Sequence, residues 1–236
     1  MLKKILIITG LLSTISVSAT ETINNKWSGD AELGYLKTTG NTETESLHLK
    51  GKVINDRNKW RHTGTLEIVD KSDTNTTTAK RWYITGQSDY KIDDKSYLFL
   101  LLSHEDDEFS GYKYQTTEVI GYGYTAIKQE DLILALEAGA GARQSKPINA
   151  SSTNEGILRG AANLEWKISK TSTFNQLLSV DAGEDSTVSR SVSSLTMNIV
   201  GNLAAKFSYS IKHSSDVPPG IEKKDTETIV TLVYKF

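Results

Sequence analysis

Along most of this 236-residue chain, apolar and polar residues alternate with a period of two. From Trp27 to Tyr35 the odd positions are apolar or small, whereas Ser28, Asp30 and Glu32 lie between them. The same alternation recurs in later segments as far as the C-terminus, and helical spacing is almost absent. Because successive side chains of a strand point to opposite faces of the sheet, the pattern predicts an all-β fold.

The alternating segments predict about twelve strands. Eight have regular faces, and four less regular ones lie near 96–105, 112–126, 172–181 and 189–199. In the segment 96–105 both faces are apolar, and in the segment 112–126 the pattern does not decide which face Glu118 occupies.

Short and long polar connections alternate between these segments. Short turns are expected at 55–58, 92–95, 128–131, 169–171 and 200–202. Longer loops are expected at 71–77, 106–111, 144–154, 182–188 and 214–225, and a tight turn at Gly40-Asn41. All three prolines fall in the expected long loops. An even strand number with short turns at one end and longer loops at the other is the plan of an outer-membrane barrel.

Alternation is also found in soluble β-sandwiches and lipocalin-like barrels. Aromatic residues, however, gather near the short turns and the termini, as rings at a membrane–water interface do. They are Trp27, Trp60, Tyr90, Tyr97, Tyr122, Tyr124, Trp166, Phe174, Tyr234 and Phe236. We therefore predict a transmembrane antiparallel up-and-down β-barrel of about twelve strands.

The first residues have the features of an export signal. Lys3 and Lys4 precede an apolar stretch from Ile5 to Val17, and Val17-Ser18-Ala19 suits a signal peptidase. We expect residues 1–19 to be a cleaved signal peptide and residues 20–236 to form a single barrel domain in the outer membrane of a Gram-negative bacterium.

The other end of the chain resembles the C-terminal signal that barrel-insertion machinery reads. It is an alternating apolar segment that ends on an aromatic residue, formed by Val230, Leu232, Tyr234 and Phe236. The expected partners are therefore the barrel-insertion machinery and outer-membrane lipid.

Composition removes several other classes of protein. The chain has no cysteine, which excludes disulfides, thiolate metal sites and cysteine nucleophiles. The 27 basic and 29 acidic residues nearly cancel, so no charge pattern indicates a nucleic-acid partner.

Several motifs resemble the YdiY-like family of putative salt-induced outer-membrane proteins, a domain family of unknown function. They are Trp27-x-Gly29-x-x-x-Leu33-Gly34, Gly40-Asn41-Thr42, Trp60, Gly121-Tyr-Gly-Tyr124 and Leu232-Val-Tyr-Lys-Phe236. The resemblance implies a barrel fold in the outer membrane and a salt or osmotic response. It supplies no reaction, substrate, cofactor or catalytic residue.

Enzymatic chemistry finds little support in the sequence. His104 follows Ser103 and precedes an acidic run, but adjacent strand residues face opposite ways and cannot readily pair. His213 precedes two serines near the expected outer rim. The run Asp106-Asp107-Glu108 lacks the ligand spacing of a calcium loop, so we expect no metal and no cofactor. A rim-site hydrolase of lipase or protease type remains an alternative to a non-enzymatic barrel.

The polar face carries charges of both signs that should line the lumen. They are Glu32, Lys50, Arg61, Glu67, Arg81, Glu137, Arg143, Arg159, Glu165 and Lys206. Such charges can line an aqueous path for small solutes or pair into a plug. We expect a narrow, weakly selective pore for small solutes or an envelope-maintenance protein, and a surface binding protein that uses the long loops is a further alternative.

The export signal gives a direct prediction. Mass spectrometry of the mature envelope protein should find Thr20 as its first residue, because cleavage is expected after Ala19. A mature protein that still begins with Met1 would contradict the prediction.

Overall fold

The computed structural model describes residues 25–38, 44–73, 76–108, 110–148 and 150–236. The expected signal peptide and the Gly40-Asn41 turn lie outside these residues. The described chain forms twelve strands: β1 (Lys26–Thr38), β2 (Thr44–Asp56), β3 (Trp60–Asp73), β4 (Thr76–Lys91), β5 (Ser96–Asp107), β6 (Tyr112–Lys128), β7 (Leu132–Pro147), β8 (Thr153–Lys167), β9 (Ser172–Gly183), β10 (Thr187–Val200), β11 (Leu203–Ser214) and β12 (Lys224–Lys235). No helix among the described residues is long and apolar enough to cross a membrane.

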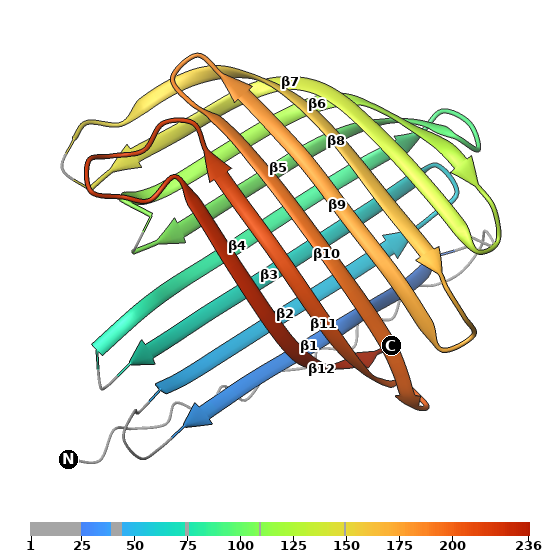
Figure 1. Ribbon diagram of the computed structural model, residues 1–236. Helices are drawn as coiled ribbons and strands as arrows, with labels where there is room; N and C mark the ends of the chain where they lie inside the picture. Colours follow the sequence, from blue (N-terminus) through green and yellow to red (C-terminus); the bar gives the residue numbers. More distant parts are fainter. Residues whose placement is uncertain (1–24, 39–43, 74–75, 109, 149) are drawn as a thin grey trace, which may run out of the picture.

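Each strand pairs antiparallel with its neighbours in sequence, and β1 also pairs with β12, so the sheet closes into a barrel (Figure 1). The predicted fold class is therefore confirmed. Closure matters because a sheet in lipid cannot leave an edge of unpaired backbone N–H and C=O groups.

The strands extend further toward the loops than the sequence pattern predicts. β3 continues to Asp73 and β4 begins at Thr76, within the expected loop 71–77. Pro147 is the last residue of β7 and lies opposite Tyr112, so it does not belong to a loop. The hydrogen-bonded ladder continues through segments in which successive residues are polar, so the alternation disappears there. Loop lengths read from alternation were therefore wrong at these places.

The structure shows which residues of the segments 96–105 and 112–126 face the inside of the barrel. In β5 the residues Tyr97, Phe99 and Leu101 point into the barrel and are buried, whereas Leu98 and Leu100 lie exposed on the outer face. Tyr97 therefore does not belong to the outer ring of aromatics in which the sequence placed it.

Glu118 of β6 lies on the outer face. It is exposed and sits opposite Leu102 on one side and Ala142 on the other.

Glycines on the inner wall make room for the rings of β5. Phe99, 2% exposed, lies so close to Gly121 that a Cβ there would be 2.6 Å from its ring. A Cβ at Gly123 would likewise overlap the ring of Tyr97. With Leu101, Val119 and Ile157 these two rings form an apolar cluster inside the barrel. The Gly121-Tyr-Gly-Tyr124 motif therefore has a packing role.

The short turns are held by local hydrogen bonds. In the β4–β5 turn, the Asp93 carboxylate accepts hydrogen bonds of 2.8 Å from the backbone N–H groups of Lys95 and Ser96. These two donors stabilise the charged form and lower the pKa of Asp93.

Phe236 closes the seam between the first and last strands. Its backbone N–H and C=O exchange hydrogen bonds of 3.0 and 2.9 Å with Gly29. Its ring covers Gly29 so closely that a Cβ there would lie 2.7 Å from the ring and 2.3 Å from the carbonyl oxygen of Lys52. The Trp27-x-Gly29 motif and the C-terminal residue are therefore parts of one contact.

Deleting Phe236 should impair barrel assembly, because it removes two backbone hydrogen bonds and the ring over Gly29. We expect the gel mobility difference between unheated and heated protein, which marks a folded barrel, to be lost or much reduced. An unchanged yield of folded protein in cells would contradict this role.

Gly29→Ala should destabilise the barrel by about 1–3 kcal/mol, the usual cost of overpacking. Gly51→Ala is the matched control, because a Cβ at Gly51 meets nothing within 4 Å. The temperature at which unheated mobility is lost measures both variants. Equal temperatures for the two variants would show that the Gly29–Phe236 contact is unimportant.

Candidate functional site

The strand registers place all ten predicted charged residues on the inner face of the barrel. Lys50, for example, lies opposite Glu32 on one side and Glu67 on the other. Three ion pairs join predicted residues directly: Lys206 Nζ lies 2.8 Å from Glu32, and Glu67 lies 2.9 Å from Lys50 and 2.7 Å from Arg81.

The remaining predicted cations pair with carboxylates that the sequence analysis did not single out. The pairs are Arg61–Asp89 at 2.9 Å, Arg143–Glu155 at 2.6 Å and Arg159–Asp181 at 2.7 Å. Each pair joins neighbouring strands, so it lies along the wall.

The last two predicted carboxylates form no ion pair with a cation of the described residues. Glu137 accepts hydrogen bonds of 2.9 Å from Gln87 and Tyr97. Glu165 lies near the short turns, and its side chain has no hydrogen bond or ion pair within the described part of the chain.

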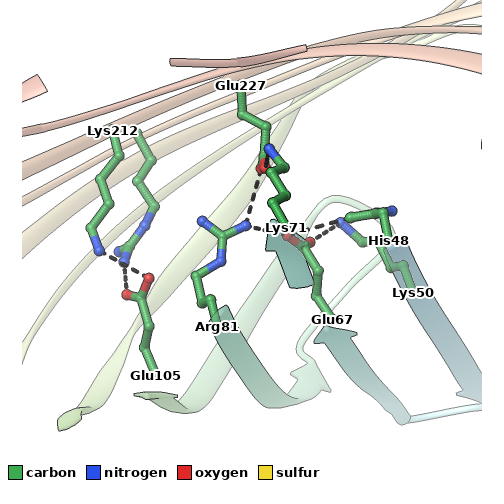
Figure 2. Close-up of polar contacts among 9 residues, drawn as sticks. His48, Lys50, Glu67, Lys71, Arg81, Glu105, Lys212 and Glu227 are labelled. Carbon is green, nitrogen blue, oxygen red and sulfur yellow. Dashed lines mark hydrogen bonds and ion pairs between the residues drawn. The ribbon is translucent and has the colours of Figure 1, made fainter. Parts of the chain in front are cut away.

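A second set of ion pairs crosses the lumen. Glu105 of β5 lies 2.5 Å from Arg190 of β10 and 2.9 Å from Lys212 of β11. Glu227 of β12 lies 2.5 Å from Lys71 of β3 and 3.2 Å from Arg81 of β4. In Figure 2, Glu105 and Arg81 extend from one wall toward Lys212 and Glu227 on the other.

We call this group the charged belt. Its members are His48, Lys50, Glu67, Lys71, Arg81, Glu105, Arg190, Lys212 and Glu227.

The charged belt lies in the half of the barrel that is nearer the loops. Lys71, Glu105 and Lys212 are each within three residues of the loop end of their strands. Beside them a cavity of about 10 Å³ is lined by Tyr83, Gln115 and Arg143, among others. That volume holds about one water molecule. The side chains around this cavity therefore pack closely.

The belt carboxylates are well removed from solvent. The Glu105 side chain is 7% exposed, and it has a cation on each side. Removing one partner of such a buried pair leaves an uncompensated charge, which typically costs about 3–5 kcal/mol. The ion pairs of the belt therefore hold Glu105 in place between Arg190 and Lys212.

One apolar side chain that points inward outside the charged belt is partly exposed. Leu177 of β9 points inward between Asn163 and Val192, yet it is 39% exposed. An inward residue with that exposure must border open space. The neighbouring inward positions carry short uncharged side chains such as Ser194 and Thr196. Leu177 therefore borders open space inside the barrel, whereas Ser194 and Thr196 are buried.

Sequence reasoning missed Glu105, Lys71, Arg190 and Glu227 as lumen residues. Lys71 and Glu227 lie close to the ends of strands whose alternation fades, and Glu105 was interpreted as part of an acidic rim. Counting by twos from Tyr97 along β5 would have reached Glu105. Counting along a strand cannot show which residue on the opposite wall each of these side chains contacts.

The candidate hydrolase residues do not form a catalytic arrangement. Ser103 points inward, whereas His104 points outward and shares a 2.8 Å hydrogen bond with Thr116. His213 lies opposite Ser189 in the register, and among the described residues no hydrogen bond of its side chain is found. Nor does the described part of the chain hold a group of three or more histidines and acidic residues that suits a metal ion.

Exposed apolar side chains surround the outside of the barrel, while the charges lie inside. Only lipid can cover such an outer surface, which places the protein in a membrane; closed barrels of this kind belong to the bacterial outer membrane.

Two porins are among the solved structures that are similar to this chain. The NanC porin matches with a TM-score of 0.54 and 11% sequence identity, over 87% of this chain and 98% of its own. The KdgM porin matches with a TM-score of 0.48 and 13% identity, over 89% of this chain and 99% of its own.

Comparison of the sequence with curated proteins finds no match. Comparison with protein families matches residues 31–236 to the family described as "Protein of unknown function, DUF481". This range includes every strand except the start of β1, and the YdiY-like resemblance is consistent with it. The chain therefore belongs to the DUF481 family.

Proposed function

We propose that the protein is a narrow, non-enzymatic pore for small solutes, in which the charged belt forms the constriction. The observation that carries the proposal is the pairing of Glu105 with Arg190 and Lys212 across the lumen. Passage then requires the ion pairs to separate or a small solute to pass between them.

The mixed charges of the belt favour weak selectivity. Around Glu105 one carboxylate faces two cations. In the other part of the belt two carboxylates, Glu67 and Glu227, face three cations, which are Arg81, Lys50 and Lys71. Because charges of both signs lie within contact distance of one another, their fields largely cancel, and the excess of two cations leaves at most a weak preference for anions. Arg61 and Arg159, which the sequence suggested as plugging residues, pair along the wall and narrow the path less directly.

Three functions considered from the sequence stay predictions. These are a salt or osmotic response, binding by the loops, and hydrolysis at the rim. The described residues give each of them less support than the constriction gives to a pore.

Planar bilayer recordings test the proposal. Wild-type protein should give small or no conductance steps without strong ion preference. Glu105→Gln leaves Arg190 and Lys212 unopposed and should shift the reversal potential toward anions. Arg190→Met with Lys212→Met leaves Glu105 alone and should shift it toward cations. Both variants should raise conductance severalfold, because the bridge across the lumen is broken.

Glu165→Gln is the matched control, because it removes a carboxylate of the inner face away from the belt. It should leave conductance and reversal potential unchanged. Gel mobility before and after heating confirms that each variant is folded. Large, steady, strongly selective steps from the wild-type protein would overturn the proposal, as would folded belt variants that conduct no better than wild type.

A further inference from the structure

The outer face of the barrel has a groove of about 520 Å³ over β2–β5, close to the short turns. Its walls are Trp27, Val53, Leu100 and Leu102, all exposed to the surroundings of the barrel; Trp27 is 62% exposed. Because these side chains point outward, the groove opens to lipid and is separate from the lumen.

Two glycines create the groove. Gly64 of β3 and Gly86 of β4 lie directly opposite each other in the register. A Cβ added at either glycine would meet no atom within 4 Å. Leu66 and Ile84, next on the outer face of the same strands, cover the sheet with large apolar side chains. The gap over the glycines therefore exposes bare backbone between apolar walls, a shape that suits an acyl chain.

The end of the groove toward the short turns is polar. Asn55, His62 and Ser88 lie opposite one another on β2, β3 and β4. His62 Nδ1 lies 2.9 Å from Ser88 Oγ, and the ring of Trp60 stacks on His62 with centroids 5.8 Å apart. Trp27 and Trp60 belong to the aromatic ring that marks the membrane interface. Hydrogen-bonding groups thus meet the groove at the depth of lipid ester groups.

A cationic side chain, that of Arg57, lies at the polar end of the groove. Arg57, in the β2–β3 turn, lines it and donates from Nε to Asn55 at 2.7 Å. Within the described part of the chain no carboxylate pairs with Arg57 or with the adjacent turn residue Lys59. A guanidinium group without a carboxylate partner suits a phosphate, to which it can donate two parallel hydrogen bonds.

We propose that this groove binds one phospholipid of the leaflet that faces the short turns. One acyl chain lies over Gly64 and Gly86, the ester region lies at His62 and Ser88, and the phosphate meets Arg57. The site is on the outer face and does not depend on conduction through the lumen.

A second copy of this chain suits the groove less well. In a two-fold contact the groove would face itself, and two concave surfaces leave a void between them. Such a contact would also bring two Arg57 side chains together, whereas an acyl chain with an anionic phosphate fits both the shape and the charge.

The site is arranged for binding and not for ester hydrolysis. A serine nucleophile needs a base that a third group orients, and donors for the developing oxyanion. In the described residues His62 forms its side-chain hydrogen bond with Ser88, whereas the Asn55 side chain bonds to Asn25 and Arg57. Gly64 and Gly86 lie within the β3–β4 ladder, which uses backbone groups of the sheet.

Native mass spectrometry of the full barrel in detergent tests the proposal with two probes, dioleoylphosphatidylglycerol and dioleoylglycerol, which lacks the phosphate. The wild-type barrel should retain one phosphatidylglycerol molecule. Gly64→Val with Gly86→Val fills the groove and should weaken that binding at least tenfold. Valine suits exposed strand positions, so this variant should fold.

Gly156→Val with Gly160→Val is the matched control, because these exposed glycines of β8 also have nothing within 4 Å of an added Cβ. It should bind phosphatidylglycerol within twofold of wild type. Equal binding by the two valine variants would overturn the proposal and leave only general lipid contact. Loss of a dimer in the Gly64 and Gly86 variant, with lipid binding unchanged, would assign the groove to a second copy instead.

Arg57→Gln tests the phosphate separately and does not depend on folding of the filled variant. It should weaken phosphatidylglycerol binding at least fivefold and change dioleoylglycerol binding less than twofold. Equal effects on the two lipids would overturn the assignment of the phosphate to Arg57.

Discussion

The structure depends first on the requirement that no strand edge remain open to lipid. Backbone N–H and C=O groups cannot find hydrogen-bond partners in hydrocarbon, so the sheet must close on itself. Closure occurs between β1 and β12, where Asp30–Leu33 lie opposite Leu232–Lys235. Phe236 adds two backbone hydrogen bonds to Gly29 and covers that glycine with its ring. The first and last strands of the chain are thereby joined.

Closure then determines what the two faces of the sheet must do. The outer face meets lipid and is apolar, so charged side chains gather inside, where water is limited. A buried charge is tolerated when it is paired, and in this barrel the pairs are of two kinds. Arg143–Glu155 and Arg159–Asp181 join neighbouring strands and strengthen the wall. The contacts of Glu105 with Arg190 and Lys212 join opposite walls and narrow the lumen.

Small residues have opposite uses on the two faces. On the inner face Gly121 and Gly123 are covered by the rings of Phe99 and Tyr97, so the glycines increase packing. On the outer face Gly64 and Gly86 are covered by no protein atom within 4 Å of an added Cβ, so they leave a groove. The inner glycines let one wall pack closely with apolar side chains, which leaves the charged belt to shape any path through the barrel. The proposed pore and the proposed lipid site thus lie on different faces of the same sheet.

The sequence by itself determined the strand number, the closed antiparallel architecture and the face of most residues, because alternation with a period of two is a local property of a strand. It also placed the ten charged residues on one face. It could not determine the strand ends at Asp73, Thr76 and Pro147, because the ladder continues where both faces are polar. Nor could it assign Tyr97, since both faces of β5 are apolar. The partners of Glu105 and Glu227 were decided only by the tertiary structure. They lie across the lumen, and the meeting of two distant strands depends on how the whole sheet curves and closes.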